Sequence, residues 1–463
     1  MLGRMAGNAA AALGEGFRGQ VIVPGDLAYD EARAVWNGAI DRHPAVIARC
    51  TGTADVLRAV AVAREHGLLV AVRGGGHNIA GLAVCDGGMV IDLSQLTGVR
   101  VDRERRIARA QPGVTWAGFD HETQAFGLAT PGGLMSSTGI AGFTLGGGFG
   151  WLSRALGLAC DNLLEADVVT ADGRLLTADD AEHPDLLWGL RGAGGNFGIV
   201  TSFSYRLHKV GPQVLCGAVF VPAERLTETL LAVRDHMLEA PDQLMLACTL
   251  LPAPSAPFLP EAVRGKPVAR VGMCWAGDPN RGLAVVAPLR ALPGAVADTV
   301  SMRPYVQWQQ MLDPGWGPGV PNYWKAEYLA VLDEAAASTI AEHFAAISSP
   351  HSDIKLAFLG GAIARTGPAD TAYTHRAAPY LLNINSRWEH GDSAPHIVWT
   401  REFWSAMRPF SAGGVYVNFL GQEGQERVVE AYGRPMFERL TALKDRYDPE
   451  NFFRVNQNIP PPT

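Results

Sequence analysis

The sequence predicts an α+β protein of two domains, and three observations lead to that prediction. The chain has 463 residues, of which 48% are hydrophobic and 18% charged, so it is long enough to bury sizeable cores. Short strand-like runs alternate with helical patterns over the first 200 residues. From about Ser204 the pattern changes and indicates a central domain with an antiparallel sheet covered by helices.

The first domain is expected to begin with a helix at residues 55–65, where four apolar residues fall on one side. Thr53 or Asp55 is expected to cap the start of that helix. Strand-like runs follow around 68–73, 89–93 and 106–110, and then a helical pattern at 115–126 that ends before Gly127.

The central domain contains four strand-like runs and two helical patterns. The chain then returns to the first domain near residues 404–411 and ends with a helix expected at 425–447. The expected boundaries are therefore 1–205 and 411–463 for the first domain and 206–410 for the central one. The central strands are expected at 214–221, 244–251, 268–275 and 355–359, and the helices at 223–238 and 334–347.

The segment RGGGHN at 73–78 is the most informative motif. Three consecutive glycines remove every Cβ from one surface, and successive N–H groups in such a loop can converge on a phosphate. His77 adds one reactive imidazole beside this loop, which indicates a site for a large anionic cofactor. The alternative is a tight turn between two strands, with His77 as an ordinary polar residue.

A second glycine-rich segment covers residues 132–150 and holds eight glycines. Each glycine weakens a helix or strand by about 0.5–1 kcal/mol, so a compensating interaction is expected. A cofactor that lies flat against the backbone would supply it. Close contacts between strands are the alternative explanation.

Several function classes are disfavoured. No glycine triplet follows G-x-G-x-x-G, since Ile79 stands where the third glycine should be, and this argues against a nicotinamide cofactor. No metal-ligand pattern is present, because HETQA at 121–125 lacks a second histidine. The net charge of −7 without a basic run argues against nucleic acid. Six scattered cysteines, with no signal peptide and no membrane span, lead to the expectation of a cytoplasmic protein.

RGGGHN and five further motifs along the chain resemble those of the FAD-linked oxidases of the vanillyl-alcohol oxidase superfamily, in their berberine-bridge-enzyme-like branch. The five further motifs occur in the same order as in that family. The resemblance covers nearly the whole chain and implies the two-domain PCMH-type FAD-binding fold, in which both chain ends bind FAD and the middle binds substrate. The motifs, beside RGGGHN, are PAVIARC (44–50), TGIAGFTLGGGFGWLSRALGLACDN (138–162), RGAGGNFGIVTSF (191–203), YVNF (416–419) and YDPENFFRVNQNIPP (447–461).

The resemblance also implies the cofactor site. His77 is expected to bond covalently to the 8α-methyl carbon of the flavin. The other expected contacts are Arg73, Gly74, Gly75, Gly76, Asn78 and Gly81 at the pyrophosphate; Thr138, Gly139, Gly142, Gly146, Gly147 and Gly148 at the ribityl chain and ring; Ile199 and Val200 on the adenine side; and Asn418 and Asn456 from the C-terminal part.

The sequence departs from the family at two positions. Many members attach the flavin a second time through a cysteine, but that position is Met135 here, so no second cysteinyl bond is expected. Cys160 is expected to be a small buried apolar residue. Phe419 stands where relatives often carry a tyrosine base, and a phenyl ring cannot take a proton.

Another residue must act as the base if the reaction needs one. Tyr416 and Lys355 are the two catalytic candidates, although Tyr416 could equally be a core residue and Lys355 an ion-pair partner. Tyr305, Tyr323 and His375 are further candidates. Trp308, Trp316, Tyr323 and Trp324 lie in an aromatic-rich stretch that could either wall a substrate cavity or pack against the sheet.

Three functions are consistent with these features. The first is an FAD-dependent oxidoreductase that oxidises a small organic, secondary-metabolite-like substrate and passes the electrons to O2, giving H2O2. The second is an oxygenase that works through a flavin–oxygen adduct of the N5-oxide type, because one histidyl bond and YVNF resemble the polyketide-tailoring flavoproteins of the enterocin pathway. The third is a flavin-binding protein without turnover. The sequence does not define the oligomeric state.

Overall fold

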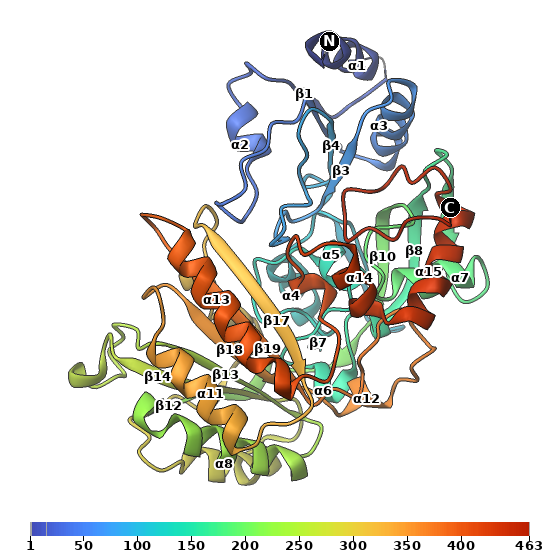
Figure 1. Ribbon diagram of the computed structural model, residues 1–463. Coiled ribbons are helices and arrows are strands. Elements are labelled where there is room, and N and C mark those ends of the chain that lie inside the picture. The colour runs from blue at the N-terminus through green and yellow to red at the C-terminus, as the bar shows by residue number, and fades with distance from the viewer. Residues whose placement is uncertain (1, 15, 463) are drawn as a thin grey trace.

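The computed structural model describes residues 2–14 and 16–462. In Figure 1 the N-terminal third of the chain, in blue to green, and the red C-terminal helices lie on one side of the molecule. The light-green, yellow and orange part between them forms the other side. Helices and strands occur together in both parts, so the α+β class is confirmed.

Two sheets form the first side. In the four-stranded sheet, β2, β4 and β3 are parallel and β1 is antiparallel to β2. All four residues of β4 are buried, as expected of an apolar run in a parallel strand covered on both faces. The second sheet has five antiparallel strands. In sheet order the strands are β1 (Gln20–Ile22), β2 (Val46–Arg49), β4 (Met89–Asp92) and β3 (Val70–Arg73), then β5 (Val99–Asp102), β6 (Ile107–Ala110), β10 (Ile199–Arg206), β8 (Leu163–Val169) and β9 (Leu175–Ala178).

The helices of this side begin close to where the sequence predicts them. Helix α3 (Thr53–Glu65) has Gly52 at its N-cap, so neither Thr53 nor Asp55 caps it. The Asp55 carboxylate accepts hydrogen bonds from Arg18 N and Thr51 N instead, because it is turned toward the preceding loop. The other helices are α1 (Leu2–Gly14), α2 (Tyr29–Arg33), α4 (Trp116–Gln124), α5 (Ile140–Leu145), α6 (Ser153–Leu156) and α7 (Pro184–Leu190).

The central part is built on one large antiparallel sheet. Apolar residues of helices α8, α9, α11 and α13 pack against one face of this sheet, which Figure 1 shows at the lower left. The opposite face packs against the first side through Trp151, Tyr373 and Tyr416. The strands, in sheet order, are β15 (Ala297–Asp298), β12 (Gln213–Pro222), β14 (Pro267–Trp275), β13 (Leu244–Pro252), β18 (Asp353–Phe358), β19 (Tyr380–Arg387) and β17 (Asn322–Leu329), and β16 (Ser301–Pro304) also pairs with β12; the helices are α8 (Leu226–Glu239), α9 (Pro279–Arg290), α11 (Glu334–Ala345) and α13 (Ala394–Met407).

The structure also corrects the expected C-terminal helix and adds elements that the sequence did not predict. The single helix expected at 425–447 is two helices, α14 (Gln425–Tyr432) and α15 (Arg434–Tyr447), because Gly433 between them has φ = 73° and ends the first. The elements missing from the prediction include strands β8, β9 and β10 of the first side and strands β17 and β19 and helix α13 of the central part. Polar residues interrupt β17 and β19, since Lys325, Asn383 and Asn385 are buried in a polar part of the sheet.

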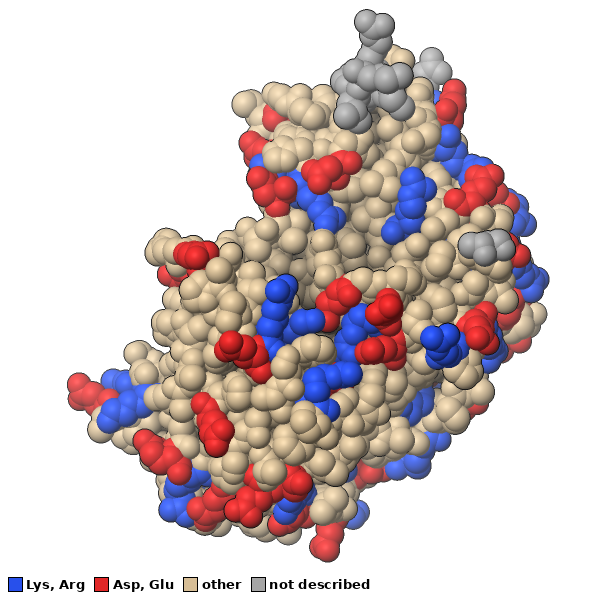
Figure 2. Space-filling view, in the orientation of Figure 1, with Lys and Arg blue, Asp and Glu red and all other residues tan. Residues whose placement is uncertain are grey.

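The surface carries charges of both signs. Figure 2 shows acidic and basic side chains interspersed over one face, with wide areas that carry neither. Among the described residues, no helix has the length and apolar character needed to cross a membrane.

Candidate active site

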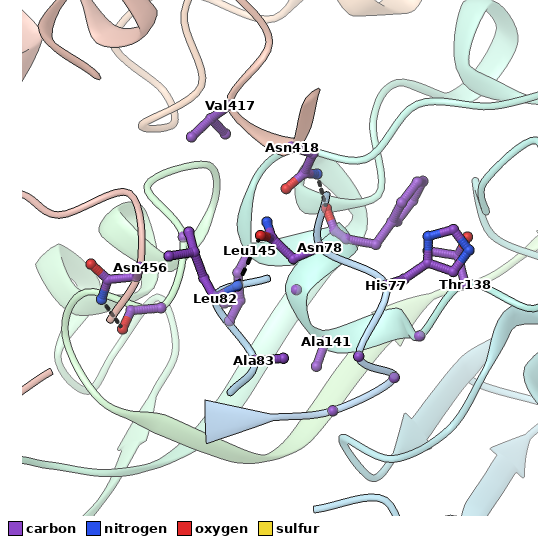
Figure 3. A pocket seen from close by; sticks show the side chains of 18 of the residues that line it. His77, Asn78, Leu82, Ala83, Thr138, Ala141, Leu145, Val417, Asn418 and Asn456 are labelled. Atoms are coloured by element: carbon purple, nitrogen blue, oxygen red, sulfur yellow. Dashed lines mark hydrogen bonds between the residues drawn. The ribbon is translucent and has the colours of Figure 1, made fainter. Parts of the chain in front are cut away.

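One cavity of about 290 Å³ lies where the glycine-rich loops meet the open face of the central sheet. Loops after β3 and before α5 form one wall, and the C-terminal tail forms another. Figure 3 shows His77, Asn78, Asn418 and Asn456 around this space. Trp316, Trp324, Lys355 and Asn383 line it from the central part of the chain.

The two glycine-rich loops touch at Gly75 and Gly139. A Cβ on either residue would lie 2.7 Å from the backbone of the other, which is closer than real Cβ atoms approach. Glycine is therefore required at both positions for the loops to meet. The result is a cavity wall of bare backbone, which suits a flat cofactor that lies against it.

His77 lies at the end of the first loop and lines the cavity. Its Nε2 is buried and has no hydrogen-bond partner among the described residues. Burial lowers the pKa of His77 to about 4, so the imidazole is neutral at neutral pH. A neutral ring nitrogen is nucleophilic, as attachment to a flavin carbon requires.

Trp36 holds the His77 ring in place. The indole stacks on the imidazole with 4.3 Å between ring centroids and 17° between planes. Trp36 N donates to Gly76 O at 3.1 Å, and Trp36 Nε1 donates to Trp316 O at 3.0 Å. The tryptophan thus connects the histidine loop to the central part of the chain.

Asn37 extends the same connection. Its amide donates to Ile79 O at 2.9 Å and to Asn322 O at 3.1 Å, and its Oδ1 accepts from Asn322 N at 2.9 Å. The segment Trp36–Asn37 therefore links the cofactor loop with the start of β17.

Tyr416 lines the cavity, and its hydroxyl oxygen accepts two hydrogen bonds. Its hydroxyl accepts from Gly148 N at 2.9 Å and from Asn418 Nδ2 at 2.8 Å. Burial raises the pKa of Tyr416 above its ordinary value. A buried phenol that stays protonated is a poor general base, so Tyr416 acts as a structural acceptor.

This role of Tyr416 leads to a testable prediction. Tyr416→Phe removes the acceptor of the buried Gly148 N–H and one of the two acceptors of the half-buried Asn418 amide, which should lower the free energy of unfolding by about 1–3 kcal/mol. The pH dependence of flavin reduction by a substrate should not change, because no base is lost. Urea unfolding and stopped-flow reduction at several pH values measure the two effects.

Tyr432→Phe is the matched control, because the buried Tyr432 hydroxyl has no hydrogen-bond partner in the part of the chain that the structure describes. Its removal should not destabilise the protein. If a folded Tyr416→Phe protein lost a rise of the flavin reduction rate with pH that the wild type shows, Tyr416 would be the base instead.

Lys355 on β18 lines the cavity from the opposite side. Its Nζ contacts both carboxylate oxygens of Asp353, at 3.0 and 2.9 Å, so the ion pair that the sequence left open is present. Burial lowers the pKa of Lys355 to about 8. At pH 7 the protonated amine therefore predominates, and the neutral form, which can accept a proton, predominates only above about pH 8.

The C-terminal tail closes the cavity. Phe453, Val455 and Asn456 line it, and Asn456 Nδ2 donates to Gly195 O at 3.2 Å and to Phe453 O at 3.0 Å. The Asn456 Oδ1 is buried and has no hydrogen-bond partner among the described residues. This acceptor is free for a ligand donor.

The structure brings twelve of the expected cofactor residues to this one cavity. They come from the first glycine loop, the second glycine segment, strand β10 and the C-terminal part of the chain. They are Gly74, Gly75, Gly76, His77, Asn78, Thr138, Gly139, Gly142, Ile199, Val200, Asn418 and Asn456.

Five expected cofactor residues do not line the cavity. The Arg73 guanidinium is buried and donates to the carbonyls of Ala32, Arg33 and Ala83, so it supports the chain behind the loop. Gly81 faces Ile40. A Cβ on Gly146, Gly147 or Gly148 would meet Asn418, Tyr373 or Phe143, respectively, so this run packs behind the site.

The remaining candidates divide clearly. Tyr305, Tyr323 and His375 are not among the residues that line the cavity, whereas Trp316 and Trp324 are. Met135 lines the cavity, and Cys160 is a buried free thiol outside it. Trp36 and Asn383 were missed, because neither belongs to a glycine motif and only tertiary contacts bring them to the site.

The residues present fit FAD. A backbone wall without Cβ atoms, the unpartnered His77 Nε2 and the unpartnered Asn456 Oδ1 border one elongated space. Residues 44–179 match the family described as FAD binding domain, and residues 415–460 match the family described as berberine and berberine like. Both matched segments contribute residues to the cavity.

The chain is similar to (R)-6-hydroxynicotine oxidase of Paenarthrobacter nicotinovorans, with 31% identity over 96% of this chain and 97% of that one. The crystal structure of 6-hydroxy-D-nicotine oxidase from Arthrobacter nicotinovorans superposes with a TM-score of 0.86 at 30% identity, over 96% of this chain and 98% of the other. A berberine-bridge-enzyme-like protein of Physcomitrella patens has the same fold, with a TM-score of 0.88 at 23% identity over 99% of each chain. The protein therefore belongs to the berberine-bridge-enzyme-like FAD-linked oxidoreductases, with a PCMH-type FAD-binding domain.

Proposed function

We propose that the protein is an FAD-dependent oxidase of a small organic metabolite, with the cofactor bonded to His77 and O2 as the electron acceptor. The supporting observation is the position of His77, whose neutral imidazole borders both the backbone wall and the substrate side of one cavity. The overall reaction converts a substrate SH2 and O2 into S and H2O2, which balances two electrons and two protons.

FAD supplies the redox chemistry, since it takes two electrons from a substrate as a hydride and passes them on to O2. The chain positions the ligand. The loops around Gly75 and Gly139 would hold the cofactor along its length, and Asn456 would approach it from the tail.

The bond to His77 also has a defined balance. It would replace one C–H bond of the 8α-methyl group of FAD and the N–H bond of the imidazole, and the two protons and two electrons released would pass to O2. Trp36 would keep the imidazole plane fixed during this step.

The substrate side of the cavity is largely aromatic. Trp324 and Phe419 meet edge to face at 5.5 Å between centroids, and both line the cavity together with Trp316. These rings exclude water and suit an apolar or aromatic substrate body. The similarity to a nicotine oxidase also supports a small organic substrate.

A second candidate is an oxygenase that inserts one oxygen atom from O2 into its substrate, as in polyketide tailoring. The observation in its favour is that none of the three residues considered as a base is well suited to that role. Phe419 cannot accept a proton, Tyr416 is held as an acceptor of two hydrogen bonds, and Lys355 is paired with Asp353. A flavin-binding protein without turnover is the third candidate.

Anaerobic mixing with a panel of small metabolites, followed by exposure to ¹⁸O2, distinguishes the three. The oxidase predicts bleaching of the flavin absorbance by at least one metabolite, then one H2O2 for each product and no ¹⁸O in the product. Incorporation of ¹⁸O would establish the oxygenase. Failure of every metabolite to bleach the flavin would reject both.

A further inference from the structure

The central sheet carries an excess of positive charge around Lys355, the lysine that lines the substrate end of the cavity. Lys355 pairs in register with Thr249, which pairs with Arg270, so the two cations stand on the same face two strands apart. Arg387 on β19 and Asp353 on β18 complete a group of four ionised side chains. We call these four residues the charged group.

Lys355 and Arg387 of the charged group lie against the Trp316 ring, and Lys355 also contacts Asp353. Lys355 Nζ lies 3.5 Å from the centroid of the Trp316 ring, and the Arg387 guanidinium carbon lies 4.4 Å from it. Arg387 Nη1 donates to Gly315 O at 2.5 Å. The Asp353 carboxylate accepts from Lys355 and, at 2.6 Å, from Asn385 Nδ2.

The charges of this group do not cancel. Arg270, Arg387 and Asp353 are 5%, 6% and 5% exposed, respectively. Among the described residues, no carboxylate lies within 4.0 Å of Arg270 or Arg387, and Arg270 Nη2 donates only to Met311 Sδ at 3.0 Å. Three cations therefore face one carboxylate, and buried charge of this kind is costly unless an anion compensates it.

A separate observation points to a ligand with an acceptor atom. Asn383 pairs in register with Lys355 and lines the cavity beside it. Asn383 is only 2% exposed, and its buried Nδ2 has no hydrogen-bond partner among the described residues. An oxygen atom that approaches Lys355 would also be within reach of this amide.

We propose that the substrate carries an anionic oxygen group, a carboxylate or an ionised phenol or enol, that binds beside Lys355 and Asn383 with its apolar body against Trp324 and Phe419. The inference rests on the proposed function, because it defines the substrate class of the same site. It also separates this protein from an oxidase of cationic amines, since an ammonium group would meet two uncompensated positive charges.

Titration calorimetry on the flavin-loaded protein tests the proposal with benzoate, and with benzylammonium as a cation of the same shape. Benzoate should bind with one site per chain, at least tenfold more tightly than benzylammonium. Lys355→Met should weaken benzoate binding at least tenfold, and Lys355→Arg should restore most of it. Lys266→Met removes an exposed lysine from the β13–β14 hairpin and should change nothing.

Two more measurements depend on the sign of the charge. Asp353→Asn removes the only carboxylate of the charged group, so benzoate binding should become tighter. In the wild type, benzoate binding should weaken above about pH 8, because the protonated form of Lys355 is the binding form and its pKa is lowered to about 8 by burial, with Arg270 and Arg387 also lowering it and Asp353 raising it. The pKa of Arg270 is lowered to about 10, so this residue keeps its charge at pH 8.

Equal or tighter binding of benzylammonium, or unchanged benzoate binding by a folded Lys355→Met, would overturn the proposal. These outcomes are independent of the oxidase test. If a metabolite bleaches the flavin but benzoate does not bind, the inference alone fails. If benzoate binds as described but no metabolite bleaches the flavin, the proposed function alone fails.

Discussion

His77→Ala should abolish the yellow colour that stays with the polypeptide after denaturation in acid. The wild type should retain at least most of its flavin under these conditions, because a C–N bond survives unfolding and non-covalent contacts do not. The variant keeps the backbone wall at Gly75 and Gly139, so it should still bind FAD reversibly. Absorbance of the precipitate and supernatant after acid treatment measures the retained fraction.

Two further variants make this result specific. Cys160→Ala should retain the flavin as the wild type does, since Cys160 is a buried thiol outside the cavity. Trp36→Leu removes the ring that stacks on His77 at 4.3 Å and should slow covalent attachment to added FAD without preventing binding. Flavin released freely by the wild type, or retained by His77→Ala, would refute the covalent role of His77.

The glycine-rich parts of the site could be predicted from the sequence because their reason is local. Consecutive glycines permit close backbone approach wherever they occur, and Gly75 and Gly139 do meet in the structure. The same argument does not tell which glycines face the cavity. Gly147 belongs to an equally glycine-rich run, yet a Cβ there would meet Tyr373 rather than a ligand.

Residues that depend on distant contacts could not be predicted. Trp36 reaches His77 only because its segment crosses between the cofactor loop and β17, and no motif in its neighbourhood signals this. Arg73 was misassigned for a related reason. A cation beside a phosphate-binding loop is a natural ligand, but three backbone carbonyls already satisfy its guanidinium.

The polar centre of the large sheet explains why its strands were harder to recognise than those of the first sheet. Strand β4 begins with three apolar residues, Met89–Ile91, whereas β19 carries Asn383 and Asn385 toward the cavity face. Hydrophobic pattern predicts strands that are buried for stability alone. It fails where burial serves a polar site, and for this reason it missed β17 and β19 at the substrate end of the cavity.

Lys444→Met, in helix α15, should strongly destabilise the attachment of the tail that closes the cavity. Lys444 and Asp448 are both fully buried, and Lys444 Nζ donates to Asp448 Oδ2 at 2.7 Å. The same amine donates to Asn196 O and Phe453 O, each at 2.8 Å. Methionine fills a similar volume but leaves a buried carboxylate without its cation, which should lower the free energy of unfolding by about 3–5 kcal/mol.

The effect should reach the cofactor, because Phe453 begins the stretch of tail that lines the cavity. Asp448 also accepts hydrogen bonds from Phe452 N at 2.7 Å and Phe453 N at 2.8 Å, so loss of Lys444 loosens both anchors of that stretch. Urea unfolding should therefore show a lower midpoint, and proteolysis should cut the tail first. Lys209→Met, at an exposed lysine, is the matched control and should leave both unchanged. A Lys444→Met protein as stable as that control would mean that packing, rather than the ion pair, holds the tail over the cofactor.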